Sequence, residues 1–166
     1  DMFLSEVCRK WEAATSAASE AGIRAVQHRF GVVLSTDGGA LAKMLLPFKL
    51  GLGGRVGSGD QYWSWITLDD LVASIRHVID DESISGPVNA VAPTPSTNLE
   101  FTRSMGRALH RPTIFPMPAF VARLMLGEMA DELLLGGARV RATVLEQTGF
   151  QWADPELDQA LLRILR

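Results

Sequence analysis

The chain has 166 residues, the length of one ordinary domain, and 47% of them are hydrophobic, which suits a globular core. A formal net charge of −3 argues against a nucleic-acid footprint, which needs clustered lysine and arginine, and no apolar run is long enough to span a membrane. The lone cysteine, Cys8, excludes an internal disulfide and favours a reducing cytoplasm, and the histidines lack zinc-ligand spacing.

The chain takes up a helical pattern almost from its first residue. Its apolar residues recur at i, i+3 and i+4 spacing and form one stripe: Leu4, Val7, Cys8, Trp11, Ala14 and Ala18. Because Cys8 lies on this stripe, we expect a packed thiol rather than a reactive one. Neither a signal peptide nor an initiating methionine precedes the helix, so we interpret the sequence as a piece of a longer chain.

Strand and helix patterns alternate after this first helix. Gly22 is a plausible end for it, and residues 23–34 are rich in apolar and β-branched side chains. This composition predicts one strand that is buried on both faces, as in a parallel sheet. Residues 40–50 predict a short helix that Pro47 kinks or ends.

The clearest helix is predicted over residues 67–81. Thr67 and Asp70 have capping-box spacing at its start, and Asp69 with Asp70 suits a first turn, where the helix dipole favours negative charge. Its apolar positions predict the buried face: Leu68, Leu71, Val72, Ile75, Val78 and Ile79.

The remaining elements continue the alternation. They are a strand over 86–92, a helix from a second capping box (Thr97 and Glu100) to about 109, an extended segment over 113–118, an apolar helix over 119–135 and a last helix over 155–165. This order implies an α/β fold with crossover connections. So few strands do not make a stable parallel sheet alone, so we expect preceding sequence to supply the rest.

A glycine-rich stretch over residues 51–59 leads into Tyr62, Trp63 and Trp65. Glycine allows positive φ angles and a close approach to a ligand or to another strand. The stretch is therefore either a loop that lines a binding cleft or a tight turn beside core tryptophans. Strand alternation places Trp63 and Trp65 on the same face but does not say whether that face is core or pocket.

Common phosphate-binding and catalytic motifs are not found. Residues 51–59 contain neither a G-x-G-x-x-G fingerprint nor the G-K-S/T of a P-loop. No Ser-His-Asp or Cys-His arrangement can be argued from spacing either.

Two segments resemble motifs of the extended short-chain dehydrogenases/reductases. Residues 57–70, GSGDQYWSWITLDD, are similar to that superfamily's G-x-G-x-Q-x-R-D-F-hydrophobic-H-V-x-D segment, and residues 29–34, RFGVVL, resemble its strand-end motif. Within the superfamily the chain resembles the NAD(P)-dependent epimerase/dehydratase subgroup, also labelled nucleoside-diphosphate-sugar epimerases. Further motifs of that subgroup are W-E at 11–12, G-G-A-L-x-K-M at 38–44, G-L-G-G at 51–54 and a C-terminal extension from Pro116 onward.

The resemblance implies an α/β fold in two parts. Residues 1–110 would be the C-terminal, substrate-side part of a Rossmann-like doubly wound fold, and residues 111–166 a mainly helical C-terminal extension. A preceding N-terminal half of the same chain would bind NAD or NADP. The implied partners are that half and a small-molecule substrate, with no nucleic acid and no membrane, and a homodimer is left open. The implied compartment is the cytoplasm.

The resemblance also carries site residues over by position. Arg29, Phe30, Gly31 and Val32 would lie near the nicotinamide end of the cofactor and contact it mostly through their backbone. The substrate pocket would be lined by Lys43, Leu46, Arg55, Gln61 and Trp63. No metal is expected, and no catalytic residue is assigned in this chain.

Two departures from the family pattern leave the function open. Aligning Glu12 with the glutamate after the usual Tyr-x-x-x-Lys motif places Cys8 at the lysine and Leu4 at the tyrosine. Trp63 stands where sugar-nucleotide epimerases carry a diphosphate-binding arginine, and Arg55 is the nearby substitute. The complete protein is therefore either an NAD(P)-dependent epimerase-type oxidoreductase, of which this piece alone is inactive, or a catalytically degenerate regulatory or scaffold protein.

Overall fold

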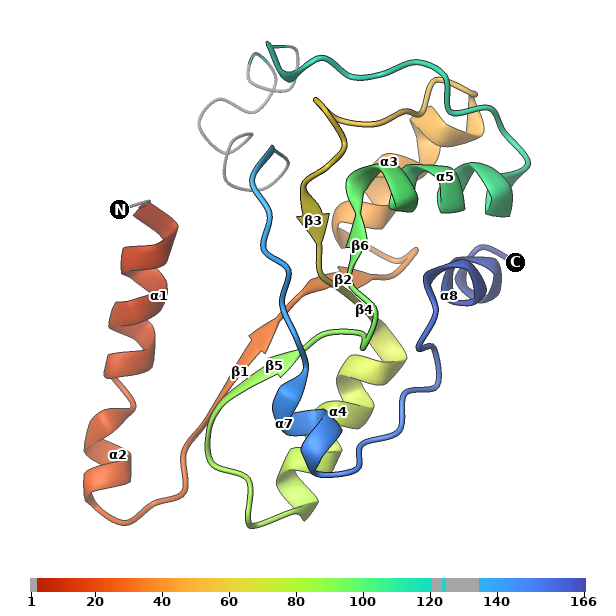
Figure 1. The fold of residues 1–166 in the computed structure, drawn as a ribbon. Helices are drawn as coiled ribbons and strands as arrows, with labels where there is room; N and C mark the ends of the chain where they lie inside the picture. Colours follow the sequence, from red (N-terminus) through yellow and green to blue (C-terminus); the bar gives the residue numbers. More distant parts are fainter. Residues whose placement is uncertain (1–2, 121–123, 125–134) are drawn as a thin grey trace.

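The computed structural model describes residues 3–120, 124 and 135–166 (Figure 1). Its elements in chain order are α1 (Phe3–Ala13), α2 (Ser16–Glu20), β1 (Val26–Phe30), β2 (Val32–Leu34), α3 (Gly39–Lys49), β3 (Tyr62–Trp63), β4 (Trp65–Thr67), α4 (Leu68–Asp80), β5 (Gly86–Ala90), β6 (Ser96–Thr97), α5 (Asn98–Leu109), α7 (Thr143–Gln147) and α8 (Leu157–Ile164). The expected α/β class with parallel strands is confirmed. Within these ranges, no helix has the length and apolar character needed to cross a membrane.

The strands form three pairs, and the chain changes partner at Gly31. β1 pairs with β5 and β2 with β4, both parallel, while β3 and β6 are antiparallel. The Gly31 N–H donates to the Ala90 carbonyl (3.1 Å), whereas the next N–H, that of Val32, donates to the Ser64 carbonyl (2.8 Å). A Cβ at Gly31 would lie 2.6 Å from the Ser64 oxygen, so only glycine fits here. The single strand predicted over 23–34 is therefore two strands.

β1 is also less buried than the sequence pattern predicted. Its residues are half-buried or exposed, and Phe30 retains 56% of its surface. The prediction of burial on both faces is wrong within the described residues, because a cavity lined by residues of α1 and β1 lies beside the strand.

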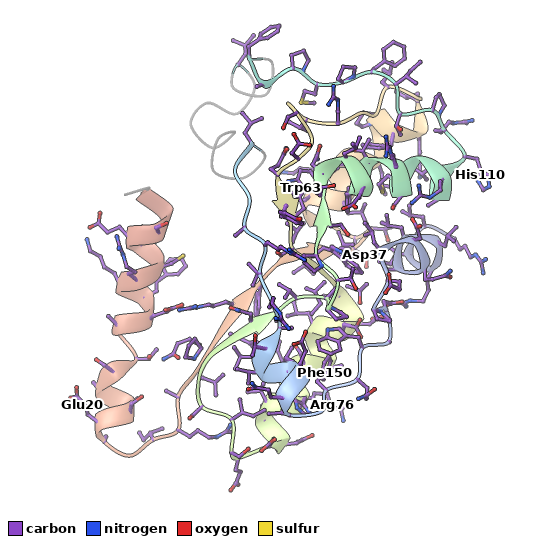
Figure 2. All side chains as sticks on the ribbon, viewed as in Figure 1. Glu20, Asp37, Trp63, Arg76, His110 and Phe150 are labelled. Atoms are coloured by element: carbon purple, nitrogen blue, oxygen red, sulfur yellow. The ribbon has the colours of Figure 1, made fainter. Side chains whose placement is uncertain are left out.

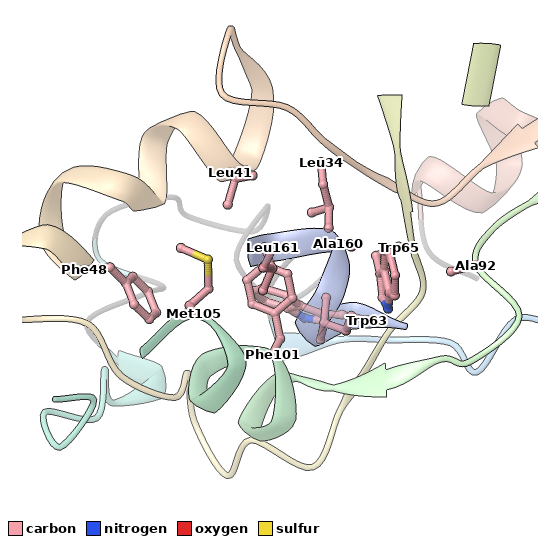
Figure 3. Packing of buried hydrophobic residues seen from close by; sticks show 11 residues of the cluster. Leu34, Leu41, Phe48, Trp63, Trp65, Ala92, Phe101, Met105, Ala160 and Leu161 are labelled. Atoms are coloured by element: carbon pink, nitrogen blue, oxygen red, sulfur yellow. The ribbon is translucent and has the colours of Figure 1, made fainter. Parts of the chain in front are cut away.

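The largest buried cluster lies where β2 and β4 meet helices α3, α5 and α8 (Figure 3). Trp65 and Leu34 are 1% exposed, and Trp63 packs against Phe101 of α5 with ring centroids 5.3 Å apart. The shared face of Trp63 and Trp65, which the sequence left undecided, is therefore a core face.

Helix α4 forms as predicted, but it is rotated relative to the predicted buried face. The Thr67 hydroxyl accepts a hydrogen bond from the Asp70 N–H, which caps the helix. Leu71 and Val78 are buried, whereas three of the expected core positions, Leu68, Val72 and Ile79, are 42%, 50% and 62% exposed. The polar residues Asp70 and Ser74 are buried in their place.

Asp70 explains this rotation. Its carboxylate accepts hydrogen bonds from the backbone N–H groups of Ala153 and Asp154, at 2.8 and 3.0 Å, in the segment before α8. A buried carboxylate with two backbone donors is a satisfied structural anchor. The C-terminal segment thereby covers the face of α4 that carries Asp70.

The second capping box is confirmed in α5. Thr97 and Glu100 exchange hydrogen bonds, and the helix ends at His110, which has a left-handed backbone (φ 53°). The segment 113–118 is extended, as predicted, and pairs at Met117 with Val56. The helix predicted over 119–135 lies mostly outside the described residues.

Candidate functional site

The cavity between α1 and β1 has a volume of about 830 Å³ and is the candidate cofactor-facing site. Its lining includes Cys8, Trp11 and Glu12 from α1, and His28, Arg29 and Phe30 from β1. Figure 1 shows α1 standing to one side of β1.

Two polar contacts tie α1 and the turn that follows it to β1. Arg29 donates from Nε and Nη2 to the two carboxylate oxygens of Glu12, each at 2.6 Å. The hydrogen bond from Arg29 holds the pKa of Glu12 below its ordinary value, and Glu12 raises the pKa of Arg29 in return. Gln27 donates to the Thr15 hydroxyl at 2.5 Å, one turn further along. These contacts position the helix and engage the Arg29 guanidinium with a carboxylate.

Cys8 is exposed and lines the cavity, so the prediction of a packed thiol is wrong. That prediction rested on the apolar stripe of α1, which the described residues leave largely uncovered: Trp11, on the same stripe, is 71% exposed. The position that the resemblance equates with the family's lysine is therefore accessible from the cavity.

The four residues expected near the cofactor lie together where β1 gives way to β2. Arg29 and Phe30 line the cavity, and Gly31 and Val32 follow directly at the change of strand partner. The side chains alternate along β1: Arg29 reaches α1, while the His28 ring lies 3.5 Å from the Ser74 hydroxyl of α4, and burial lowers the pKa of His28.

The five residues expected at the substrate are spread over three segments. Lys43 and Leu46 are exposed on α3, Trp63 is in the core, and the Gln61 amide donates to the Val56 carbonyl at 3.0 Å. Arg55 donates to the Ser58 carbonyl at 2.6 Å and lines a cavity of about 240 Å³ that includes none of the other four. Their grouping in one substrate pocket stays a prediction.

The glycine-rich stretch makes close contacts with protein. A Cβ at Gly53 would lie 2.5 Å from the Phe48 ring, and one at Gly54 would lie 1.8 Å from the Phe115 carbonyl oxygen. These glycines let the loop approach α3 and the extended segment closely, which favours the tight-turn interpretation at both positions. Arg55, directly after them, still faces a cavity.

Sequence reasoning missed two groups of residues. The Ser64 hydroxyl donates to the Ala138 carbonyl (2.7 Å) and accepts from the Val140 N–H (3.0 Å), which ties the C-terminal segment to the strands, and no sequence signal marks it. Arg103, Arg107 and Arg111 were also missed, although their i, i+4, i+8 spacing places them along one side of α5 and its end. Among the described residues, no group of His, Cys, Asp or Glu side chains has the arrangement of a metal site.

The chain matches known proteins over nearly its whole length. Residues 117–164 match the family described as Domain of unknown function (DUF1731). The epimerase family protein Mb2239 of Mycobacterium bovis is 46% identical over 159 residues, which are 96% of this chain and 53% of that protein. The chain thus spans about half the length of the curated relatives that it matches.

Two solved structures are similar in both sequence and fold. The crystal structure of the human epimerase family protein SDR39U1 (isoform 2) with NADPH is 42% identical with a TM-score of 0.82, covering 86% of this chain and 48% of that one. The nucleoside-diphosphate sugar epimerase from Corynebacterium glutamicum is 34% identical with a TM-score of 0.59, covering 99% and 38%. The chain therefore belongs to the epimerase family of the extended short-chain dehydrogenases/reductases.

Proposed function

We propose that this chain is the substrate-facing half of an NAD(P)-dependent oxidoreductase of the sugar-nucleotide epimerase/dehydratase type. A preceding N-terminal half of the same chain would supply the main dinucleotide site, and the protein would act in the cytoplasm on a small-molecule substrate. The observation that carries the proposal is the open cavity beside Arg29 and Phe30, at the point where β1 gives way to β2. The human relative crystallised with NADPH supports a nicotinamide cofactor.

In this proposal the chain positions the cofactor and the substrate. A nicotinamide cofactor would supply hydride transfer. The Phe30 ring and the backbone of Gly31 and Val32 would meet its nicotinamide end, while the Glu12–Arg29 pair fixes the cavity wall. Lys43, Leu46, Arg55 and Gln61 remain the proposed substrate residues. Because Trp63 is buried in the core, it is no longer proposed to line the pocket, and Arg55 is the better candidate for a phosphate group. Residues 1–110 would form the Rossmann-like part and 111–166 the extension.

Titration of the full-length protein with NADPH and NADH, followed by tryptophan fluorescence, tests the proposal. We expect saturable quenching with at least one of the two, and weaker binding in Gly31→Ala. Gly38→Ala is the matched control, because a Cβ there meets nothing within 4 Å. A flat response with both cofactors would overturn the proposal.

One observation favours a second function, that of a degenerate NAD(P)-binding regulatory or scaffold protein. Cys8 lies in the cavity at the position that the family gives to lysine, and the neighbouring Arg29 is neutralised by Glu12. Assays with a panel of nucleoside-diphosphate sugars separate the two functions. Turnover by the natural protein that survives Cys8→Ser supports the enzyme, whereas cofactor binding without turnover supports the degenerate protein.

A further inference from the structure

A basic groove runs along α5 and the segment that follows it. Two adjoining cavities, of about 510 and 240 Å³, share Arg103 and Thr113 in their linings. Their other basic lining residues are Arg55, Arg107, His110 and Arg111. Neither lining contains an aspartate or a glutamate, although the whole chain carries a net charge of −3.

The fold brings these residues together at the turn after α5. His110, labelled in Figure 2 at the end of α5, takes the left-handed conformation that reverses the chain. The returning segment then runs so close that a Cβ at Gly106 would lie 2.9 Å from the Arg111 carbonyl and 2.6 Å from the Thr113 methyl carbon. Glycine at 106 thus lets Arg111 and Thr113 lie directly against the helix side that carries Arg103.

The nearest carboxylates are already engaged with other groups. Glu100 accepts hydrogen bonds from the Thr97 N–H and hydroxyl, at 2.7 and 3.0 Å. Asp158 accepts from Arg107 at 2.6 Å and neutralises one arginine of the groove. No hydrogen bond or ion pair joins Arg103 to any residue that the structure describes, so its guanidinium has all its donors available.

Helix-dipole complementation accounts for only part of the cluster. Cations in the last turn of a helix stabilise its carboxyl end, which explains Arg107, His110 and Arg111. Arg103 lies in the middle of α5 and Arg55 lies in another segment, so neither has that role. Arginines that converge on a cavity without a carboxylate are the arrangement that binds phosphate groups.

We propose that this groove is a binding site for an oligophosphate, with Arg55, Arg103 and the Thr113 hydroxyl holding one phosphate group and Arg107 and Arg111 holding the next. The groove shares no lining residue with the cavity between α1 and β1. It shares only Arg55 with the proposed substrate residues, whereas Arg103, Arg107 and Arg111 belong to the groove alone, so the variants at Arg103 and Asp158 test the groove separately from the proposed function.

Calorimetric titration of inorganic triphosphate into the full-length protein, saturated with NADPH so that the cofactor site is filled, tests the proposal. If NADPH does not bind, the same titration is run without it, so the two proposals fail separately. We expect saturable binding that weakens from triphosphate to pyrophosphate to orthophosphate and as salt is raised. A titration with ATP in place of triphosphate identifies the kind of ligand that the groove binds. Equal affinity for the two indicates an inorganic oligophosphate, whereas tighter binding of ATP indicates a nucleotide; both results support the site.

Three variants make the result specific. Arg103→Glu should weaken triphosphate binding about tenfold or more, as expected for losing a charge-assisted contact. Arg76→Glu makes the same charge change on an exposed residue of α4 that lines neither cavity, and should leave the affinity nearly unchanged. Asp158→Asn frees Arg107 and should tighten binding a few-fold, a gain that loss of structure does not produce.

Three results would overturn the site: no saturable binding, equal losses in Arg103→Glu and Arg76→Glu, or binding to anionic vesicles without binding to soluble triphosphate. Should Arg103→Glu not fold, as judged by its thermal unfolding, Arg103→Gln takes its place with the same expected direction.

Discussion

Two neighbouring regions of this chain differ sharply in how they are covered. In the closed region, β2 and β4 are packed by α3, α5 and α8, and Trp65 and Ile66 are 1% and 0% exposed. In the open region, made of α1, α2 and β1, Trp11 and Phe30 are 71% and 56% exposed. One glycine, Gly31, separates β1 from β2.

The difference shows where apolar side chains are buried within the described residues and where they are exposed. The closed region buries its apolar side chains within these residues, which is what stabilises a domain. The open region presents apolar side chains and a cavity, and it carries the residues that resemble the family's cofactor contacts. We expect substitutions in the closed region to lower the free energy of unfolding strongly, and substitutions in the open region to lower it less.

The largest effect is expected for Trp65→Ala, which breaks the closed region. Removing a fully buried aromatic side chain should lower the free energy of unfolding by about 3–5 kcal/mol, measured by urea denaturation of the full-length protein. Trp11→Ala is the matched change in the open region, and on this structure it should cost little. A large loss there instead would mean that other sequence covers α1.

Gly31→Ala acts at the boundary between the two regions. The added Cβ would lie 2.6 Å from the Ser64 carbonyl oxygen and 2.9 Å from the Val91 side chain, so backbone must shift. We expect a loss of about 1–3 kcal/mol in unfolding free energy, with Gly38→Ala nearly neutral. If both variants unfold at the same urea concentration, the backbone at Gly31 does not approach the Ser64 carbonyl as closely as the structure shows.

Asp70→Asn tests the anchor between α4 and the C-terminal segment. The carboxylate accepts from two backbone N–H groups, whereas an amide keeps one acceptor oxygen, so one donor loses its partner. We expect a loss of about 1–3 kcal/mol in unfolding free energy. Asp69→Asn, the exposed neighbour that pairs with Arg163, should cost about 0–1 kcal/mol. Equal losses in the two variants would contradict the anchor.

The smallest effect is expected for Glu12→Gln, which sharpens the description of the open region. The Glu12–Arg29 pair is partly exposed, with side-chain exposures of 32% and 51%, so it should contribute about 0.2–1 kcal/mol. Hydrogen exchange of the α1 amides should report its loss more clearly than global unfolding does, because α1 opens locally.

The pH dependence of this pair has a definite sign. Arg29 lowers the pKa of Glu12 in the folded chain below its ordinary value of 4.5. The stabilisation is therefore fully present above pH 4.5 and is lost as the pH falls through the lowered pKa. The difference between the natural chain and Glu12→Gln should vanish in that acidic range; a difference that grows there would contradict the pair.

The sequence predicted the elements that short-range chemistry determines. The caps at Thr67 and Thr97 were found because a hydroxyl and the N–H three residues later interact within one turn. The α/β alternation was found for a similar reason, since periodicity is a local property. The assignment of Arg29, Phe30, Gly31 and Val32 to the cofactor came from the resemblance and stays a prediction, although Arg29 and Phe30 do line the cavity between α1 and β1.

The tertiary structure decided which faces those elements bury. Hydrophobic pattern ranked Val72 and Ile79 above Asp70, yet Asp70 is buried because backbone donors far along the chain satisfy it. The exposure of Cys8, the break at Gly31 and the groove around Arg103 likewise depend on contacts between distant segments. Capping and periodicity depend on interactions within a few residues. Burial and the clustering of like charges depend instead on which segments, distant in sequence, pack against each other, and this is determined by the packing of the whole chain.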